Sequence, residues 1–138
     1  MKINIKLEEF AYMPEKAYKS DAGFDLKSPR DVWVLSKNYA VVDTGVHIDI
    51  PEGYVGFLKS KSGLNVKKSL TTEGVIDAGY TGSIVVKIYN NSNTNYKFAK
   101  GDKITQLVIL PIPEIEFEVV DEFEATERGS NGFGSTGK

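Results

Sequence analysis

The sequence contains no cysteine and only one histidine, His47, among its 138 residues. Without cysteine the chain cannot form disulfides, cysteine-ligated zinc sites or thiolate nucleophiles. One histidine cannot build a clustered histidine metal site within one chain, and a Ser-His-Asp triad would have to use His47. The zinc chemistry of base deaminases, which needs histidine and cysteine ligands, is excluded on the same ground.

Neither sign of charge is in clear excess, because 17 Lys and Arg residues stand against 19 Asp and Glu, for a formal net charge of −2. Proteins that bind nucleic acid backbones normally carry a surplus of Lys and Arg, so we expect no direct binding of nucleic acid. An anionic ligand would have to be met by a few local cations.

Long apolar runs are also lacking. No segment approaches the roughly 20 apolar residues that span a bilayer. Residues 1–7 alternate between polar and apolar side chains and lack the apolar centre of a signal peptide. We therefore expect a soluble, cytoplasmic protein that makes no contact with a membrane.

Period-two alternation of polar and apolar residues is the dominant pattern along the chain. It predicts a strand over 46–50, a turn at Pro51-Glu52-Gly53 and a second strand over 54–58, and we expect the two strands to pair as a hairpin. Residues 84–89, rich in β-branched side chains, and residues 104–110, which are mostly apolar, predict two further strands.

The remaining segments complete an all-β pattern. Residues 115–119 alternate between apolar and acidic side chains, which predicts a strand with a solvated acidic edge. Helical periodicity is sustained nowhere, and residues 65–68, after Gly63, allow only a short helical turn. Many short strands separated by Gly, Pro and Asn turns are typical of a sandwich or barrel, here within a single domain.

The C-terminal residues 128–138 differ in composition, with four glycines in a short stretch. Glycine loses the most backbone entropy on ordering, so this composition is typical of a terminus without fixed structure. The same segment also carries an aromatic ring, Phe133, a cation, Arg128, and hydroxyl groups. A mobile arm would use such groups to stack on a base and to hold phosphates, so both interpretations stay open at this point.

Glycine-flanked polar segments recur at predicted strand ends, and they cover residues 22–26, 59–64, 74–80 and 101–107. Each alone is ordinary turn chemistry. Together with the tail, and in this order, they resemble the five ordered motifs of the trimeric dUTP pyrophosphatase family. The resemblance runs from Asp21 to Gly137. Its most specific parts are Gly-Val-Ile-Asp-Ala-Gly-Tyr at 74–80 and Gly-Phe-Gly-Ser-Thr-Gly at 132–137.

This resemblance implies a β-rich, distorted jelly-roll-like barrel of the β-clip type, assembled as a homotrimer with active sites between the subunits. It implies hydrolysis of dUTP to dUMP and pyrophosphate by Mg²⁺-assisted attack of water on the α-phosphorus. Such a reaction limits uracil in DNA and supplies dUMP for dTTP synthesis. The resemblance also places the barrel domain at 1–127 and a mobile arm, closing over the active site, at 128–138.

By the resemblance, Asp77 is the catalytic general base, because it matches the aspartate of the third motif. A positioned carboxylate can orient a water molecule and take its proton during attack on phosphorus. Tyr80 matches the tyrosine that lies under the deoxyribose, where a ring leaves no space for a 2′-hydroxyl. Without the resemblance, Asp77 would be a turn residue that caps its own backbone, and Tyr80 a core or hairpin tyrosine.

The second and fourth motifs imply a phosphate site. Ser62 and Gly63 would bind the phosphate chain through a hydroxyl and backbone N–H groups, since glycine lets the backbone come close to an anion. Lys61 stands where the family commonly has arginine, which keeps the charge but loses the bidentate fork. Gln106 would reach the phosphates with its amide, and as a polar residue in an apolar strand it needs a hydrogen-bonding partner in any case.

Asp25 matches the aspartate of the first motif, which implies a Mg²⁺ ion held through water while the substrate phosphates are its direct ligands. Magnesium often keeps several of its waters in this way. The alternative role for Asp25 is a structural cap at the subunit interface. Uracil would be read largely by backbone groups of residues 70–74, and the substrate-binding residues of this region would be Thr71, Gly74, Val75 and Ile76.

The arm would complete the site from a different subunit. Phe133 would stack on uracil and Arg128 would reach the terminal phosphate, while Gly134, Ser135 and Thr136 would add further contacts. Two residues outside the arm also depart from the family pattern. Some members have Asn where this chain has Thr71, and Arg is frequent at the position of Thr81.

Other functions fit parts of this pattern. A dCTP deaminase shares the fold and much of the glycine pattern, with Glu73 as the nearest candidate base, but the Phe-bearing tail fits it poorly. A catalytically silent regulatory protein would keep the scaffold and contact a partner protein when dUTP is bound. A structural jelly roll without a ligand would leave the order of the motifs unexplained. Retention of Asp77, Tyr80 and Phe133 favours the enzyme.

Overall fold

The computed structural model describes residues 1–134 and 137. These residues form one short helix, α1 (Ser62–Lys68), and ten strands. The strands are β1 (Asn4–Leu7), β2 (Gly23–Lys27), β3 (Val32–Val34), β4 (Tyr39–Asp43), β5 (Val46–Asp49), β6 (Tyr54–Lys59), β7 (Leu70–Ile76), β8 (Val85–Asn90), β9 (Tyr96–Phe98) and β10 (Lys103–Pro111). No helix among the described residues is long and apolar enough to cross a membrane.

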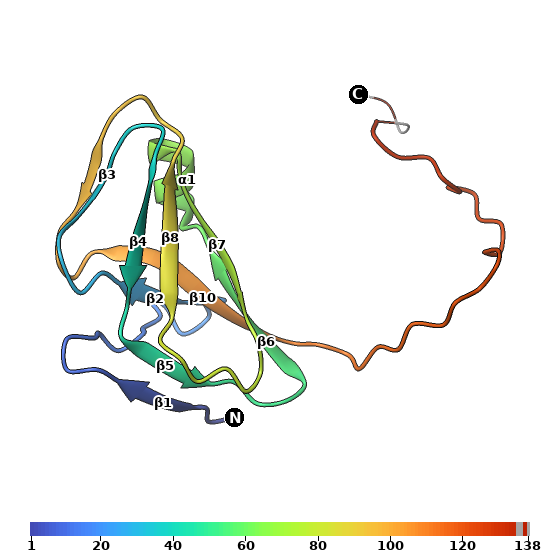
Figure 1. Ribbon diagram of the computed structural model, residues 1–138, viewed down its shortest axis with the longest axis horizontal. Coiled ribbons are helices and arrows are strands. Elements are labelled where there is room, and N and C mark those ends of the chain that lie inside the picture. The colour runs from blue at the N-terminus through green and yellow to red at the C-terminus, as the bar shows by residue number, and fades with distance from the viewer. Residues whose placement is uncertain (135–136, 138) are drawn as a thin grey trace.

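One six-stranded antiparallel sheet dominates the molecule, in the order β2-β10-β6-β7-β8-β4. It curls into a half-barrel, and two short ladders, β1-β5 and β3-β9, lie beside it (Figure 1). This arrangement confirms the prediction of an all-β, jelly-roll-like fold. The strands predicted over 84–89 and 104–110 are also confirmed, as β8 and β10.

The core follows from the alternation along the strands. Along β8, Val86, Ile88 and Asn90 are buried while Val85 and Tyr89 are exposed. Side chains of the sheet and of both ladders meet in one apolar cluster, in which the largest fully buried residues include Phe98, Leu26, Ile50, Leu70 and Ile84. The alternation therefore fixes which side chains of each strand face inward.

The expected hairpin of 46–50 with 54–58 is wrong, although the turn between the strands is present. The N–H of Tyr54 donates to the carbonyl of Pro51 at 3.2 Å, and Gly53 adopts a φ of +79°. The strands then part: β5 pairs with β1, while β6 lies between β7 and β10. Both edges of β6 are already occupied, so β5 finds its partner at the N-terminus.

The helical turn allowed over 65–68 is longer than expected. It begins at Ser62 and spans seven residues as α1, which joins β6 to β7. The helix ends at Ser69, which has a left-handed φ of 55° and donates its N–H to the carbonyl of Asn65. Its residues are mostly exposed and none is buried. The sequence therefore lacks the apolar residues at every third or fourth position that mark a longer, half-buried helix.

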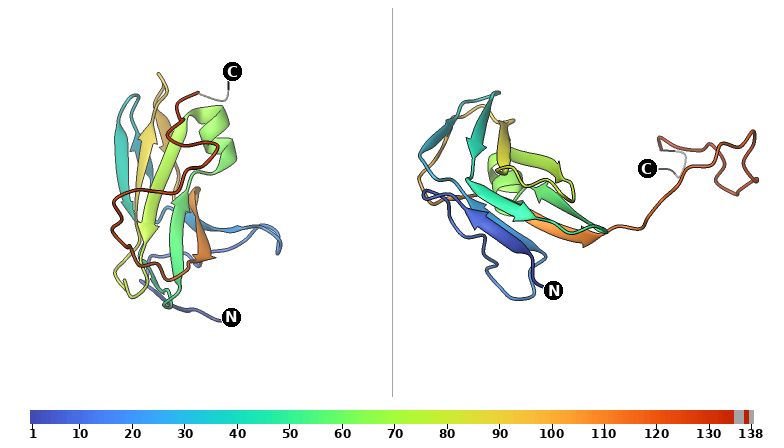
Figure 2. Two further views of the ribbon diagram at one scale, coloured as in Figure 1. Left: turned by 90° about the vertical axis from the view of Figure 1, so that its right-hand side faces the viewer. Right: turned by 60° about the horizontal axis from the view of Figure 1, so that its bottom comes forward.

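The strand predicted over 115–119 is wrong for the single chain. β10 ends at Pro111, and the chain then leaves the barrel as an extended arm (Figures 1 and 2). Phe117 and Val119 are each 97% exposed. A strand needs a hydrogen-bonding neighbour, and the described part of the chain places none beside this segment.

Candidate active site

A cluster of polar side chains forms where β2, β10 and β6 lie side by side. Gln106 of β10 stands opposite Asp25 of β2 on one side and Lys59 of β6 on the other. Lys61 follows two residues after the end of β6, and its ammonium group contacts Oδ1 of Asp25. The antiparallel register therefore brings together three of the predicted site residues: Asp25, Lys61 and Gln106.

Asp25 is almost fully buried and is held by two cations. Besides Lys61, the Nζ atom of Lys103 lies 2.7 Å from its second oxygen, Oδ2. Burial raises the pKa of Asp25, but hydrogen bonds from Lys103 and Lys61 outweigh that effect, so its pKa lies below the ordinary value. The same contact raises the pKa of Lys103. The carboxylate is therefore ionised at neutral pH.

The side chain of Gln106 is fixed by its surroundings. Its Nε2 donates to the carbonyl of Ser60 at 3.1 Å. A Cβ atom at Gly23 would lie 2.5 Å from Oε1 of Gln106, so a residue larger than glycine would displace this amide. The glycine of the first motif thus makes room for the glutamine of the fourth.

Ser62 and Gly63 open α1 next to this cluster. The preceding residue, Lys61, makes no side-chain cap, and the first turn contains no acidic residue. The first N–H groups of a helix have no partner within it, so those of Ser62 and Gly63 suit an anion. Space beside Gly63 is open, because nothing lies within 4 Å of a Cβ built there.

The cluster does not supply a direct metal site. Among residues 1–134 and 137, no group of three or more His, Asp or Glu side chains could hold an ion. Each oxygen of Asp25 contacts one lysine, and the lone pair that remains on each oxygen could accept a hydrogen bond from a metal-bound water. These donors fit a Mg²⁺ ion that keeps its waters and takes its direct ligands from elsewhere.

The second group of predicted residues lines a hollow at the end of β7. Its volume is about 220 Å³, and it is lined by Val75, Ile76, Asp77, Tyr80, Ser83 and Val85. The carboxylate-bearing Asp77 is exposed and starts a turn in which the N–H of Tyr80 donates to its carbonyl at 3.2 Å. Gly79 adopts a φ of +79° there, a conformation that favours glycine.

Tyr80 forms one wall of this hollow. Its hydroxyl donates to the carbonyl of Ser83 at 3.0 Å, which folds the ring back over Gly82. A Cβ atom at Gly82 would clash with the hydroxyl group of Tyr80. Gly82 therefore lets the ring lie against the turn, where it presents an exposed face.

Other residues expected near the base lie along β7. Gly74 stands opposite Leu58 and is half-buried. Thr71, at the other end of β7, accepts a hydrogen bond from Nδ2 of Asn91 at 3.3 Å. Thr71 therefore does not reach the hollow around Asp77, which holds Val75 and Ile76 of this segment.

The structure does not bring the two groups together within one chain. Ile76 pairs with Gly56 at one end of the β6–β7 ladder, whereas Lys59, just before Lys61, pairs with Glu73 at the other end. The arm stays apart from both groups. Arg128 donates to the carbonyl of Asn131 at 3.1 Å within the arm, and Phe133 is fully exposed. Gly134 lies beside it, whereas the predicted contacts of Ser135 and Thr136 lie outside the described residues.

The sequence interpretation missed Lys103, Ser83 and Val85. Lys103 lies inside the fourth glycine-flanked segment and is the charged residue at the start of an otherwise apolar strand, a signal that was available. Ser83 and Val85 line the hollow only because the turn after Asp77 folds back beside β8. Nothing in their local sequence marks them.

Comparison with known proteins gives the same assignment over nearly the whole chain. The family model described as dUTPase matches residues 9–137. A deoxyuridine 5′-triphosphate nucleotidohydrolase of Clostridium tetani is 40% identical over 135 residues, which cover 96% of this chain and 93% of that protein.

Solved structures agree with the sequence comparisons. The dUTPase of Staphylococcus bacteriophage 80alpha, solved with dUPNHPP, superposes with a TM-score of 0.92 at 37% identity and covers 99% of both chains. A mutant dUTPase from phage phi11 of S. aureus, described as coordinating a structural Mg(II) ion, gives a TM-score of 0.82 at 36% identity, covering 91% of this chain and 100% of that one. Fold, motif order and comparisons together place the chain in the dUTPase family.

Proposed function

We propose that the protein hydrolyses dUTP to dUMP and pyrophosphate, with Asp77 as general base. The observation that carries this proposal is the hollow in which an exposed carboxylate and an exposed tyrosine ring stand side by side at one turn. The carboxylate can activate water, and the ring can pack against a sugar that lacks a 2′-hydroxyl. The named activity of the relatives supports the same reaction.

The reaction is an in-line displacement at the α-phosphorus. Asp77 accepts a proton from water as the water oxygen bonds to phosphorus, and the bond from the α-phosphorus to the bridging oxygen of the β-phosphate breaks. Pyrophosphate leaves with the bond electrons. Lys61, Gln106 and Arg128 offset charge on the triphosphate, and the N–H groups of Ser62 and Gly63 donate to its oxygens.

Mg²⁺, when bound, would neutralise part of the triphosphate charge, and Asp25 would hold one of its waters. Lys61 could then turn from Asp25 to a phosphate, while Lys103 would keep the carboxylate ionised. In this proposal Lys61 is available to the ligand, while Lys103 stays paired with Asp25.

The active protein is a homotrimer in this proposal, because one chain does not bring its site residues together. Exposed apolar side chains on the outer face of β7, β8 and β4 support an interface there. They are Val75, Val85, Tyr89, Tyr39 and Val41, each at least 42% exposed. Exposed apolar side chains that gather in this way are typical of a subunit contact, and Lys87 lies among them with its Nζ 4.1 Å from the centroid of the Tyr39 ring.

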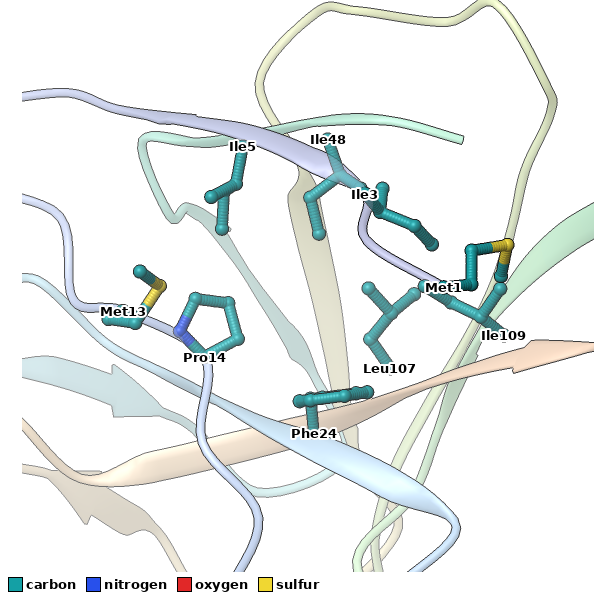
Figure 3. A pocket seen from close by; sticks show the side chains of 9 residues that line it. All are labelled: Met1, Ile3, Ile5, Met13, Pro14, Phe24, Ile48, Leu107 and Ile109. Atoms are coloured by element: carbon teal, nitrogen blue, oxygen red, sulfur yellow. The ribbon is translucent and has the colours of Figure 1, made fainter. Parts of the chain in front are cut away.

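The arm provides a second argument for assembly into a homotrimer. Ile115, Phe117 and Val119 alternate with acidic residues and have no partner within the described chain. Each barrel also carries an apolar hollow of about 240 Å³, into which side chains of β1, β2, β5 and β10 point (Figure 3). We propose that residues 112–127 pack on a neighbouring copy, which would complete the barrel domain of 1–127 and leave 128–138 as the closing arm.

The test is pyrophosphate release from dUTP with Mg²⁺, run beside UTP, dTTP and dCTP. Turnover should be confined to dUTP, and Asp77→Asn should lower kcat by about 10³-fold or more, because the base is lost while the shape of the site is kept. Tight dUTP binding without pyrophosphate release would instead leave the nucleotide-gated regulatory protein as the better account.

Ammonia release from dCTP would point to the deaminase. The structure supplies an argument against that reaction. Glu73 is exposed and lies 2.8 Å from Nζ of Lys59, and this hydrogen bond lowers its pKa. A base that abstracts protons at neutral pH is better served by a raised pKa.

A further inference from the structure

The only histidine of the chain joins the N-terminal segment to the turn that carries Asp77 and Tyr80. Nδ1 of His47, in β5, lies 2.8 Å from the carbonyl oxygen of Thr81. Nε2 of the same ring lies 3.1 Å from Oε1 of Glu8, directly after β1. The ring is mostly buried, with 18% of its side chain exposed.

Both partners of the ring are hydrogen-bond acceptors, so each ring nitrogen can bind its partner only while it carries a proton. A carbonyl oxygen faces Nδ1, so that nitrogen carries a proton and donates. Glu8, on the other side, is itself held by backbone hydrogen bonds: its N–H donates to Gly45 at 2.9 Å and its carbonyl accepts from Ala11 at 3.0 Å. These bonds fix the backbone of Glu8, and its Oε1 also lies 3.6 Å from Nζ of Lys6. The imidazole thus lies between this carboxylate and the turn.

The contact with Thr81 falls where the turn has few other attachments. Gly79 is held by the carbonyl of Ile50, and Ile84 donates to Val46 at 2.8 Å. Between these two points, across residues 80–82, the bond from His47 is the one hydrogen bond to another element among the described residues. Tyr80 and Thr81 are also largely exposed, so packing adds little support.

We propose that His47 is a positioning residue for the catalytic turn. Its Nδ1–H holds the Thr81 carbonyl and thereby sets where the Tyr80 ring and the Asp77 carboxylate lie, and Glu8 orients the imidazole. This inference rests on the proposed function, because the turn matters for dUTP hydrolysis only if Asp77 is the base. It adds β1 and β5, which contain no predicted site residue, to the machinery.

Two amide substitutions distinguish the roles of the two ring nitrogens. In His47→Asn the amide nitrogen can take the place of Nδ1 and still donate to Thr81, whereas in His47→Gln the longer amide reaches the position of Nε2 and Glu8. We expect His47→Asn to keep kcat within about threefold of the wild type. His47→Gln and His47→Ala should lower kcat about tenfold, as expected for a misplaced catalytic group, and should raise the UTP-to-dUTP rate ratio at least about threefold, because the ring of Tyr80 excludes ribose less well.

Asp49→Asn is the matched control, since it changes a side chain of the same strand that contacts Asn4 and not the turn. Equal effects of the Asn and Gln substitutions, or an unchanged UTP-to-dUTP ratio in His47→Ala, would overturn the proposal. Hydrogen exchange of the amides of residues 77–83 gives a readout without turnover: it should be faster in His47→Gln than in His47→Asn. If the wild type releases no pyrophosphate, the proposed function fails, and the exchange rates alone decide the role of His47.

Discussion

Asp25 shows how one residue can have two uses that compete. Its carboxylate is buried and ion-paired to Lys61 and Lys103, so it stabilises the junction of β2, β6 and β10. The sequence resemblance marked Asp25 only for its place near the metal. The alternative role, a structural cap at the subunit interface, stays a prediction. The sequence did not mark Lys103 as a partner of Asp25, which the structure shows.

The lowered pKa of Asp25 predicts a pH-dependent contribution to stability. The folded-state pKa lies below the ordinary value of 3.8, so the contribution is complete above that pH and is lost as the pH falls through the folded-state pKa. Asp25→Asn should lower the free energy of unfolding by about 1–3 kcal/mol at pH 7. The difference from the wild type should shrink as the pH falls below 3.8 and through the lowered folded-state pKa.

Urea unfolding of both proteins at several pH values measures this difference. Asp31→Asn is a useful comparison, because Asp31 is ion-paired to Lys97 at 2.8 Å but is largely exposed. Exposed pairs contribute little, so this control should change stability less at every pH. A constant difference for Asp25→Asn from pH 7 to pH 2 would contradict the assignment of the ion pairs.

At the scale of elements, the residue pattern predicted four strands, β5, β6, β8 and β10, but not which strands pair. β8 and β10 could be predicted because their side chains alternate or are apolar over their full length. The pairing of β5 could not, because a turn at Pro51 and Gly53 fits both a hairpin and a strand that leaves for another sheet. Pairing depends on which edges are free, and that is a property of the whole sheet.

The segment 115–119 has the composition of a strand but no place in its own chain. Its apolar residues are exposed because the edge that would pair with it is not supplied by the described residues. The candidate site likewise contains residues that a sequence motif marks and residues that only the fold brings in. Asp77 and Tyr80, marked by the resemblance, lie in the hollow, and Gln106 lies in the polar cluster, while their roles stay predictions. Ser83 depends on a fold-back that leaves no local trace.

If the arm packs on a neighbouring copy, an acidic substitution there should disturb assembly. Phe117→Asp places a charge on an apolar side chain that we expect to be buried between subunits, and burying an unpaired charge is costly. Light scattering after size-exclusion chromatography should show a shift from trimer towards smaller species. Val66→Asp, at an 82% exposed position of α1, is the control and should leave the mass unchanged. Identical masses for both variants would argue against burial of Phe117.

At the scale of the molecule, the separation of Asp77 from the Lys61 cluster predicts that different subunits supply the parts of one site. Chains carrying Asp77→Asn retain the arm, and chains ending at residue 127 retain Asp77. Each alone should be nearly inactive. Mixed trimers from equal amounts should regain about a quarter of the wild-type sites, if arm and base come from different subunits and mixing is random.

Co-refolding of the two variants, followed by pyrophosphate release from dUTP, measures this recovery. Mixing without refolding is the control, because subunits that do not exchange cannot form hybrid sites. No recovery from trimers shown by mass to be mixed would mean that the arm and Asp77 of one site come from the same chain.

The ion pairs of Asp25 also place a carboxylate of the protein in competition with any anionic ligand of Lys61. If Lys61 binds a phosphate, as we propose, that phosphate competes with a carboxylate that is tethered to the same molecule and therefore acts at a high effective concentration. Each added negative charge on the ligand improves its position in that exchange, so a triphosphate displaces Asp25 more readily than a monophosphate does. If Lys61 binds a phosphate, the cluster would favour nucleotides of higher negative charge, and the monophosphate product would be released most easily.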